Sequence, residues 1–302
     1  MSSLPTTIPA YLEQLRAALG GADRALVQDA LYDAEEYLRS ELAEHPGKSE
    51  AEVIAAVAGS YGAPEEVAGI YRDTEVTVQT ALRAPPPPPR RSLVGRFFGV
   101  AAEPRTYSAL FYMVLALATG IFYFTWVVAG VSMTAGFGVL IIGIPFAILY
   151  FGSVRVLSLV EGRMVEVMLG ERMPRRPLYT GREKPLLERI RDLFLDPRSW
   201  STQLYFLLML PLGIAYFTTV VIGLALSLGL IAMPFLGLFG HSDAITLQGA
   251  GVVLDSPWSW VIGAFCGVVI LFACLHLVRL VGGWHGQLAK HLLVKSAQPV
   301  VA

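Results

Sequence analysis

The sequence is poor in charge and in cysteine, and it lacks the common catalytic motifs. Charged residues make up 16% of its 302 positions and hydrophobic residues 54%, unlike a typical soluble domain. The only cysteines, Cys266 and Cys274, lie in an apolar segment, so they predict neither a disulfide framework nor a zinc site. No GxxxxGKS/T, HExxH or GxSxG sequence occurs, and no segment supplies the phospho-acceptor histidine and glycine-rich pocket of a kinase. We therefore expect a non-enzymatic protein with no catalytic residues, no cofactor and no bound metal.

Charged residues are missing altogether from three long segments. These run from Arg105 to Arg155, from Arg198 to Asp243 and from Asp255 to Arg279. A helix needs roughly 20 apolar residues to cross a bilayer, so the sequence predicts an all-α, multi-pass membrane protein. We expect spans at about 108–131, 138–160, 203–226 and 259–281.

The charges that are present are unevenly divided. Residues 1–84 contain 14 acidic and 6 basic side chains, and the remaining residues contain 10 acidic and 17 basic ones. This pattern predicts an acidic soluble head on a basic membrane body, and it argues against direct nucleic-acid binding. The polar, helix-patterned start of the chain does not resemble a signal peptide.

The membrane body contains an internal repeat. Residues Leu93 to Gly130 return, shifted by 93 positions, as Leu186 to Gly223. The shared features, in the first copy, are an acidic-Pro-Arg turn at Glu103–Arg105 followed by Tyr112, Gly120, Tyr123, Phe124 and Gly130. Repetition of this kind predicts two copies of one structural unit. We place the repeats at residues 93–185 and 186–302.

Residues 1–82 carry the pattern of about four amphipathic helices. Val27, Leu31, Ala34, Leu38 and Leu42 form one apolar stripe. Ser49 and Glu52 predict a capping box for a third helix, and Pro64 predicts the first turn of a fourth.

The Tyr11–Leu15 segment, the acidic second helix and the Gly62-Ala-Pro-Glu-Glu-Val-Ala68 turn resemble the helical domain associated with anti-sigma factors (HAAS). The resemblance covers about residues 8–73. It implies a cytoplasmic interaction module, often encoded beside PadR-type transcriptional regulators. Candidate partner-binding residues are Asp29, Asp33, Glu36, Glu65 and Glu66.

A linker and two interfacial helices connect the head to the spans. Five prolines, Pro85–Pro89, predict an extended polyproline II spacer within residues 83–92. Residues 93–98, and their counterparts at 186–194, combine apolar side chains with arginines and predict helices in the headgroup layer.

The acidic-Pro-Arg turns are candidate membrane-interface or sensing sites. An acidic N-cap followed by proline suits a helix start, and an arginine with an aromatic residue suits headgroup depth. Structure alone can explain this pattern, so a sensing role is the less favoured interpretation. The candidates are Glu103, Pro104, Arg105, Tyr107, Asp196, Pro197, Arg198 and Trp200.

Loop charges predict the orientation in the membrane. Lys and Arg precede the first span, gather between the second and third, and follow the fourth, while the two other loops contain none. The positive-inside rule then places both termini and the central loop in the cytoplasm, in the inner membrane of a bacterium. Arg155 and Arg279 would reach the cytoplasmic interface from the ends of their spans.

The second halves of the two repeats align at a different sequence offset from the first halves. Leu159–Arg163 aligns with Leu280–Trp284 at an offset of 121, which places 28 extra residues before Leu280. Residues 227–240 are apolar but contain Pro234 and several glycines, so they are either part of a span or a re-entrant piece. Residues of about 240–257 would form the external loop.

The double pattern, together with Gly143-Ile144-Pro145, resembles the sensor domain of bacterial membrane signalling proteins. The resemblance covers about residues 100–295. It implies a signalling role, although the kinase region that often follows this domain is missing from the sequence.

Buried ionisable groups are not expected from this reading. The predicted spans contain none at mid-depth, which counts against an ion or proton pump. His285 and His291 would lie on opposite faces of a helix, so a metal site with His276 and Cys274 is disfavoured. Glycines 120, 130, 136, 138 and 143 favour close helix packing, either within the chain or in a homodimer.

Two classes of function stay open. The first is a non-enzymatic membrane sensor that detects a membrane-associated stimulus and whose head binds a cytoplasmic regulator, of the PadR type or of the sigma/anti-sigma pathway. The alternative is an accessory subunit of a membrane transporter or membrane-assembly complex. A membrane enzyme acting on lipid headgroups is disfavoured, because no acid–base residues cluster at either interface.

Overall fold

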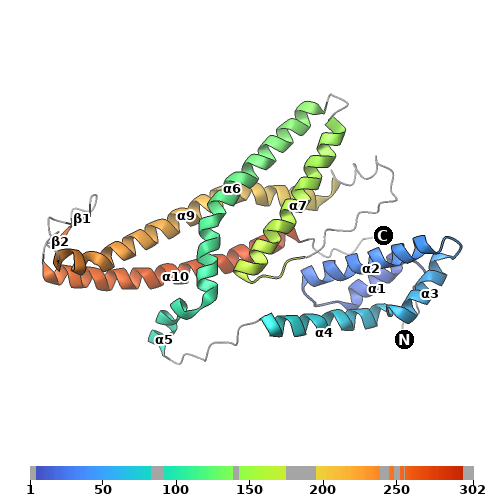
Figure 1. Ribbon diagram of the computed structural model, residues 1–302, viewed down its shortest axis with the longest axis horizontal. Helices are drawn as coiled ribbons and strands as arrows, with labels where there is room; N and C mark the ends of the chain where they lie inside the picture. The colour runs from blue at the N-terminus through green and yellow to red at the C-terminus, as the bar shows by residue number, and fades with distance from the viewer. Residues whose placement is uncertain are drawn as a thin grey trace.

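The computed structural model describes residues 5–82, 92–138, 143–174, 195–238, 245–247, 252–254 and 256–294. They form an all-α fold with one short antiparallel β-hairpin (Figure 1). The elements are α1 (Ile8–Ala18), α2 (Arg24–Glu44), α3 (Glu50–Ser60), α4 (Pro64–Leu82), α5 (Leu93–Phe98), the 3₁₀ helix η1 (Gly99–Ala102), α6 (Pro104–Phe137), α7 (Gly143–Leu169), α9 (Pro197–Leu238), β1 (Ile245–Leu247), β2 (Val252–Leu254) and α10 (Pro257–Leu293). The predicted fold class is confirmed. The proline spacer and the second interfacial helix lie outside the described residues.

Helices α1–α4 form the head, as the sequence predicts. The Ser49–Glu52 capping box starts α3, and Pro64 starts α4. Tyr11 is fully buried in the core of the head and donates a hydrogen bond to the carbonyl of Gly62, at 2.8 Å. Gly62 has φ +110°, a left-handed conformation that suits glycine, so it can make the turn between α3 and α4.

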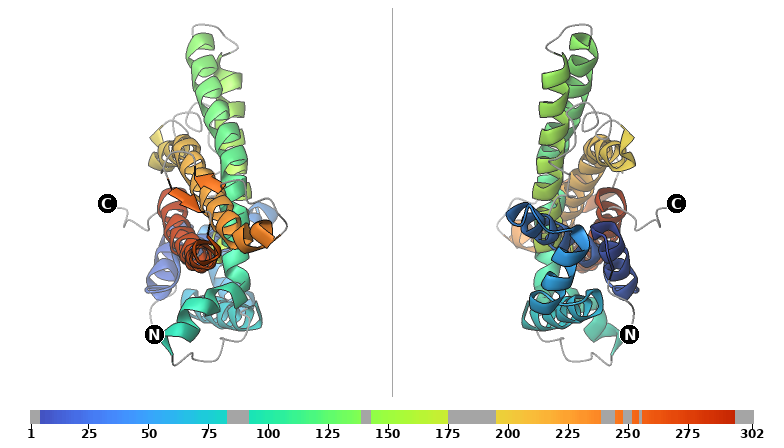
Figure 2. Two further views of the ribbon diagram at one scale, coloured as in Figure 1. Left: turned by 90° about the vertical axis from the view of Figure 1, so that its left-hand side faces the viewer. Right: turned by 90° about the vertical axis from the view of Figure 1, so that its right-hand side faces the viewer.

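Four helices of the body are long and apolar enough to cross a membrane. They are Pro104–Phe137, Gly143–Leu169, Pro197–Leu236 and Pro257–Leu293. They form two hairpins, α6–α7 and α9–α10, which cross along α6 and α9 and point their loop ends in different directions (Figures 1 and 2).

The crossing depends on one glycine from each repeat. A Cβ atom added to Gly120 of α6 would overlap the carbonyl of Met209, and one added to Gly213 of α9 would overlap the carbonyl of Ala116. Ala116 and Met209 are themselves 93 positions apart, so the two contacts are related by a local twofold axis. The repeat therefore corresponds to a symmetric packing of α6 on α9.

The predicted offset of 121 for the second helices is wrong. Ser108 donates to the carbonyl of Met168 at 2.7 Å, and the equivalent Ser201 donates to that of Leu292 at 2.8 Å. Met168 and Leu292 are 124 positions apart. The alignment of Leu159–Arg163 with Leu280–Trp284 was therefore three residues out of register.

The same offset of 124 relates two ion pairs that join the repeats. Arg155 of α7 lies 3.6 Å from Asp196 at the start of α9, and Arg279 of α10 lies 2.7 Å from Glu103 at the start of α6. Each arginine therefore pairs with the acidic turn of the other repeat.

Residues 227–238 are not re-entrant. They continue α9, a 42-residue helix that passes through Pro211 and Pro234. The extra length of the second repeat lies in α9, in α10 and in the connection that carries β1 and β2. Helices α7 and α10 also continue past residues 160 and 281, where the predicted spans end.

Of the glycines expected to pack closely, Gly120 and Gly130 do so, whereas a Cβ at Gly136 would meet no atom within 4 Å. We predict that Gly120→Ala lowers the free energy of unfolding by about 3 kcal/mol, because the added methyl group meets backbone that cannot move aside. Gly213→Ala should have a similar effect, since it occupies the equivalent position. Reversible unfolding in mixed detergent micelles measures this effect.

Gly136→Ala is the matched control and should leave the stability unchanged or slightly raise it, because alanine favours a helix. Equal effects at the three positions would contradict the packing of α6 on α9 described above.

Candidate functional site: a buried acid–base cluster

Where the two hairpins cross, they enclose a carboxylate and an imidazole. Glu161 of α7 is 0% exposed and His285 of α10 is 1% exposed. Both lie within helices apolar enough to span a membrane. Four tyrosines surround them: Tyr112, Tyr123, Tyr205 and Tyr216.

Three of these hydroxyls donate to the carboxylate of Glu161. Tyr112 and Tyr205 donate to Oε1 at 2.6 and 2.8 Å, and Tyr123 donates to Oε2 at 3.0 Å. Both carboxylate oxygens thus have donors from α6, and Oε1 has a second donor from α9. This supplies the hydrogen bonds that an ionised carboxylate loses when it leaves water.

His285 contacts two of these tyrosines, Tyr112 and Tyr205, and also Tyr216. Its Nε2 lies 2.7 Å from the hydroxyl of Tyr112 and 3.0 Å from that of Tyr205, and its Nδ1 lies 3.0 Å from the hydroxyl of Tyr216. Because Tyr112 and Tyr205 give their protons to Glu161, Nε2 must carry a proton and donate to their oxygens. Nδ1 can then accept from Tyr216, and every polar atom of the cluster is paired with His285 neutral.

With Glu161 ionised and His285 neutral, the cluster would carry one net negative charge. A second proton on the imidazole would place a positive charge on the other side of the shared hydroxyls of Tyr112 and Tyr205 from Glu161. Nδ1 would then donate, and the Tyr216 hydroxyl would need to turn its proton elsewhere. The arrangement can therefore hold one additional proton, at the cost of one hydrogen-bond rearrangement.

The cluster has the symmetry of the repeats. Glu161 and His285 are 124 positions apart, and each tyrosine has its counterpart 93 positions away. Glu161 receives Tyr112 and Tyr123 from its own repeat and Tyr205 from the other, while His285 contacts Tyr205 and Tyr216 of its own repeat and Tyr112 of the other. The acid and the base thus occupy equivalent places.

No buried ionisable group was expected in the body, because neither Glu161 nor His285 lies inside a predicted span. The predicted spans stopped at residues 160 and 281, one and four residues before Glu161 and His285, whereas α7 and α10 continue to Leu169 and Leu293. The signal that could have revealed the cluster was the repeated tyrosine pair, which requires buried partners.

The histidine–cysteine metal site was disfavoured from the sequence. His276 has a separate partner: its Nε2 atom lies 3.0 Å from the carbonyl oxygen of Phe97. Across the described ranges, no group of three or more His, Cys, Asp or Glu side chains is placed to hold a metal ion.

The predicted interface residues form helix starts and inter-repeat contacts. Pro104 and Pro197 are the first residues of α6 and α9. Tyr107 is half exposed and donates to the carbonyl of Ala101, and Trp200 is half exposed beside Phe151.

The acidic and basic residues of the two turns make different contacts in the two repeats. The carboxylate of Asp196 accepts from the backbone N–H of Arg198, at 3.1 Å, and also faces Arg155. The guanidinium of Arg105 lies over Gly170, at the end of α7.

Two of the five predicted partner-binding residues face the protein itself. Asp29 is buried against Arg172, and Asp33 accepts a hydrogen bond from Tyr71 at 2.8 Å. Burial, together with the neighbouring Tyr61, raises the pKa of Tyr71 well above its usual value, so its phenol stays a donor. Glu36, Glu65 and Glu66 are exposed, and Glu66 accepts from the backbone of Ala63.

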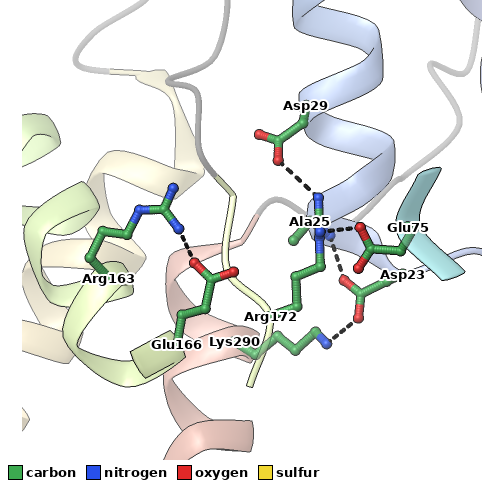
Figure 3. Close-up of polar contacts among 8 residues, drawn as sticks. All are labelled: Asp23, Ala25, Asp29, Glu75, Arg163, Glu166, Arg172 and Lys290. Carbon is green, nitrogen blue, oxygen red and sulfur yellow. Dashed lines mark hydrogen bonds and ion pairs between the residues drawn. The ribbon is translucent and has the colours of Figure 1, made fainter. Parts of the chain in front are cut away.

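Ion pairs hold the head on the body (Figure 3). Arg172, which follows α7, lies between Glu75 of α4 and Asp29 of α2, with the Asp29 contact at 3.4 Å. Lys290 of α10 pairs with Asp23, the N-cap of α2. The side chain of Arg172 is only 14% exposed, so its contact with the head excludes most of the water.

These features define a multi-pass membrane protein built from two related helical hairpins. The chain matches the family described as "Putative sensor" over residues 112–293. It therefore belongs to this family, and the matched segment contains Glu161, His285 and all four tyrosines. No curated protein and no solved structure matches the chain significantly. The match begins after the head, so the HAAS resemblance stays a prediction.

We predict that Glu161→Leu and His285→Leu each lower the free energy of unfolding by about 3–5 kcal/mol, because each leaves buried polar groups without a partner. The double variant should cost clearly less than the sum of the two, since Glu161 and His285 share the hydroxyls of Tyr112 and Tyr205 and are removed together. Unfolding in mixed micelles measures all three variants.

Glu166→Gln is the control, because Glu166 pairs with Arg163 within α7, and it should change stability little. Strictly additive effects of the two leucine variants would show that the acid and the base do not act as one cluster.

Proposed function

We propose that this protein is a non-enzymatic sensor of the bacterial inner membrane, with both termini in the cytoplasm. Its membrane body responds to a stimulus that arises in the bilayer. Its head passes the response to a cytoplasmic regulatory protein, of the PadR type or of the sigma/anti-sigma pathway. The family match over residues 112–293 supports the sensing role.

The observation that carries the proposal is the place where the head docks. Arg172 and Lys290 follow Glu161 and His285 on the same two segments, at the ends of α7 and α10. A change in the buried cluster that moves α7 relative to α10 would also move the two basic residues that hold the head. The body and the head are therefore mechanically connected.

Docking covers part of the surface that a partner would use. Asp29 is buried against Arg172, while Glu36, Glu65 and Glu66 are accessible on the same domain. A regulator that recognises the acidic face of α2 would gain Asp29 when the head leaves the body. The HAAS resemblance supports such a partner, because that domain is an interaction module.

We predict that the double variant Arg172→Glu/Lys290→Glu releases the head. Each substitution places a new carboxylate beside existing ones, so the ion pairs become repulsive. Hydrogen exchange measured on the full-length protein in nanodiscs should rise for the start of α2 and for the Glu75 region of α4. It should stay unchanged in α6 and α9.

Arg163→Glu is the matched control, because the partner of Arg163 is Glu166, one turn away on its own helix (Figure 3). A regulator identified by crosslinking in native membranes, and then purified, should bind the double variant more tightly than the wild type. Unchanged exchange in the double variant would contradict ion-pair docking, and a transporter subunit as the crosslinked partner would favour the accessory role.

A further inference from the structure

Three helices enclose a hollow of about 360 Å³ beside the first hairpin. Its mostly apolar walls come from α6, α7 and the start of α9, and include Val131, Ala135, Ala147, Phe151 and Trp200. None of its lining residues in the described part of the chain is charged. Ile144 and Trp200 are half exposed, on helices apolar enough to span a membrane, so a molecule dissolved in the bilayer can reach the hollow. Its volume falls in the range of small-molecule sites.

One wall of the hollow carries a buried polar pair. Tyr150 of α7 and Gln203 of α9 line it, and each is only 4% exposed. The Tyr150 hydroxyl donates to Oε1 of Gln203 at 3.0 Å, and Nε2 of Gln203 donates to the carbonyl of Ser199 at 3.3 Å. A primary amide has two N–H groups. Among the described residues the second N–H of Gln203 has no acceptor, so this wall offers one free donor.

The packing of the fold does not require this polar pair. Gly130 leaves the space for the ring of Tyr150, since a Cβ atom added to Gly130 would overlap that ring. In the other repeat, a Cβ atom added to Gly223 would meet the Sγ atom of Cys274, so Cys274 takes the place of the tyrosine. The counterpart of the glutamine, 93 positions earlier, is Leu110. The equivalent position is thus built from a cysteine and a leucine.

Smaller side chains help to leave the hollow empty. The register of the repeats holds as far as the loop ends, because a Cβ atom on Gly143 would overlap the carbonyl of Phe137 and one on Gly267 would overlap the equivalent Leu230. In this register, four lining residues are smaller than their counterparts: Val131, Ala135, Gly138 and Ala147 correspond to Leu224, Leu228, Ile231 and Leu271. The first hairpin therefore has less side-chain volume at the positions around the hollow.

We propose that this hollow binds a small, uncharged amphiphile dissolved in the bilayer: an apolar molecule with one oxygen that accepts a hydrogen bond, such as a carbonyl. The oxygen accepts from the second N–H of Gln203, and the apolar body lies against Ala147, Phe151 and Trp200. An amide N–H without an acceptor is costly in apolar surroundings, so a ligand that supplies the acceptor is favoured.

Two other occupants fit less well. The acyl chain of a bulk phospholipid carries no oxygen along its length, so it would fill the hollow and leave the N–H of Gln203 unpaired. An anionic headgroup would enter without a counter-charge, because no charged side chain lines the hollow in the described ranges, and a buried charge without a partner is strongly unfavourable. The chemistry of the walls therefore selects a neutral ligand with an internal acceptor.

This inference names a class of stimulus and rests on the proposed sensing function only for its meaning to the cell, since binding depends on the hollow alone. Tyr150 lies on α7, the helix that carries Glu161. Gln203 lies two residues before Tyr205, which donates to Glu161. A ligand held between α7 and α9 therefore contacts both of the helices that this hydrogen bond joins at the buried cluster.

The test uses the full-length protein in phosphatidylcholine nanodiscs and a photoreactive probe, methyl nonyl ketone with a diazirine at the end of its chain. After irradiation, mass spectrometry locates the labelled residues, which should lie around the hollow on α6, α7 and α9. Unlabelled methyl nonyl ketone should compete for the labelling. Undecane, compared at equal concentration in the bilayer, should compete about tenfold less well, because it cannot accept the hydrogen bond.

Two variants that borrow residues from the other repeat separate the parts of the site. Gln203→Leu should abolish the difference between the ketone and the alkane, because it removes the donor. Ala147→Leu should prevent most of the labelling, because it fills the hollow. Gln287→Leu is the matched control, since Gln287 is exposed on α10 and donates to Glu171, and it should label like the wild type. Circular dichroism verifies that each variant is folded.

The competition in the wild type decides the proposal even if a variant fails to fold. Equal competition by ketone and alkane would overturn it in favour of an ordinary acyl chain, and labelling that excess ketone does not reduce would exclude a specific site. A folded Gln203→Leu variant that keeps the full preference for the ketone would also contradict it. None of these readouts involves the head or a regulator, so a failure here is distinguishable from a failure of the partner-binding test.

Discussion

A carboxylate in the middle of an apolar helix bundle must find its hydrogen bonds inside the protein, and Glu161 finds them on both hairpins. Tyr112 and Tyr123 come from α6 and Tyr205 from α9, while His285 closes the cluster from α10. If the hairpins moved apart, the carboxylate and the hydroxyls would lose these hydrogen-bond partners. The cluster therefore sets how α6, α7, α9 and α10 can be arranged, more than the apolar contacts do, since lipid tails can replace those.

The remaining contacts of the body are consistent with this constraint. The glycines at the crossing allow α6 and α9 to approach closely enough for tyrosines from each to reach the same carboxylate oxygen. The exchanged ion pairs of Arg155 and Arg279 then fix the second helix of each hairpin to the start of the other hairpin. These contacts lie away from the loop ends of the hairpins, which differ between the repeats because α9 and α10 are longer than α6 and α7.

Sequence reasoning worked where the signal is local. The capping box at Ser49, the start of α4 at Pro64 and the four apolar helices follow from residues close together in the chain. The 93-residue shift was also readable, because Gly120, Tyr112 and Tyr123 recur with distinctive side chains. The second helices were misaligned by three residues, because small and aliphatic residues around Gly162 and Gly282 match at several offsets. Only contacts across the fold, such as Ser108 to Met168 and Ser201 to Leu292, establish the register.

The buried cluster was missed for a related reason. The predicted second span ended one residue before Glu161 and the predicted fourth span ended four residues before His285, so neither residue was considered as part of the membrane helices. Glu161 of α7 and His285 of α10 are connected through tyrosines on α6 and α9. The contacting residues are far apart in the sequence, by 173 positions for Tyr112 and His285. No window of sequence contains that information. In the head, composition identified an acidic domain, but not that Asp29 is turned toward Arg172 of the body.

The equivalence of positions 161 and 285 bears on why the two halves are joined in one chain. A symmetric dimer of identical half-length chains places the same residue twice about its axis. Two glutamates there would repel each other, and two histidines would leave the tyrosines without a carboxylate acceptor. Covalent fusion frees each half to change by itself, so that one can supply the acid and the other the base. The cluster of Glu161 and His285 is therefore asymmetric about the local axis that relates the two hairpins, which a symmetric homodimer could not achieve with one residue type at this position.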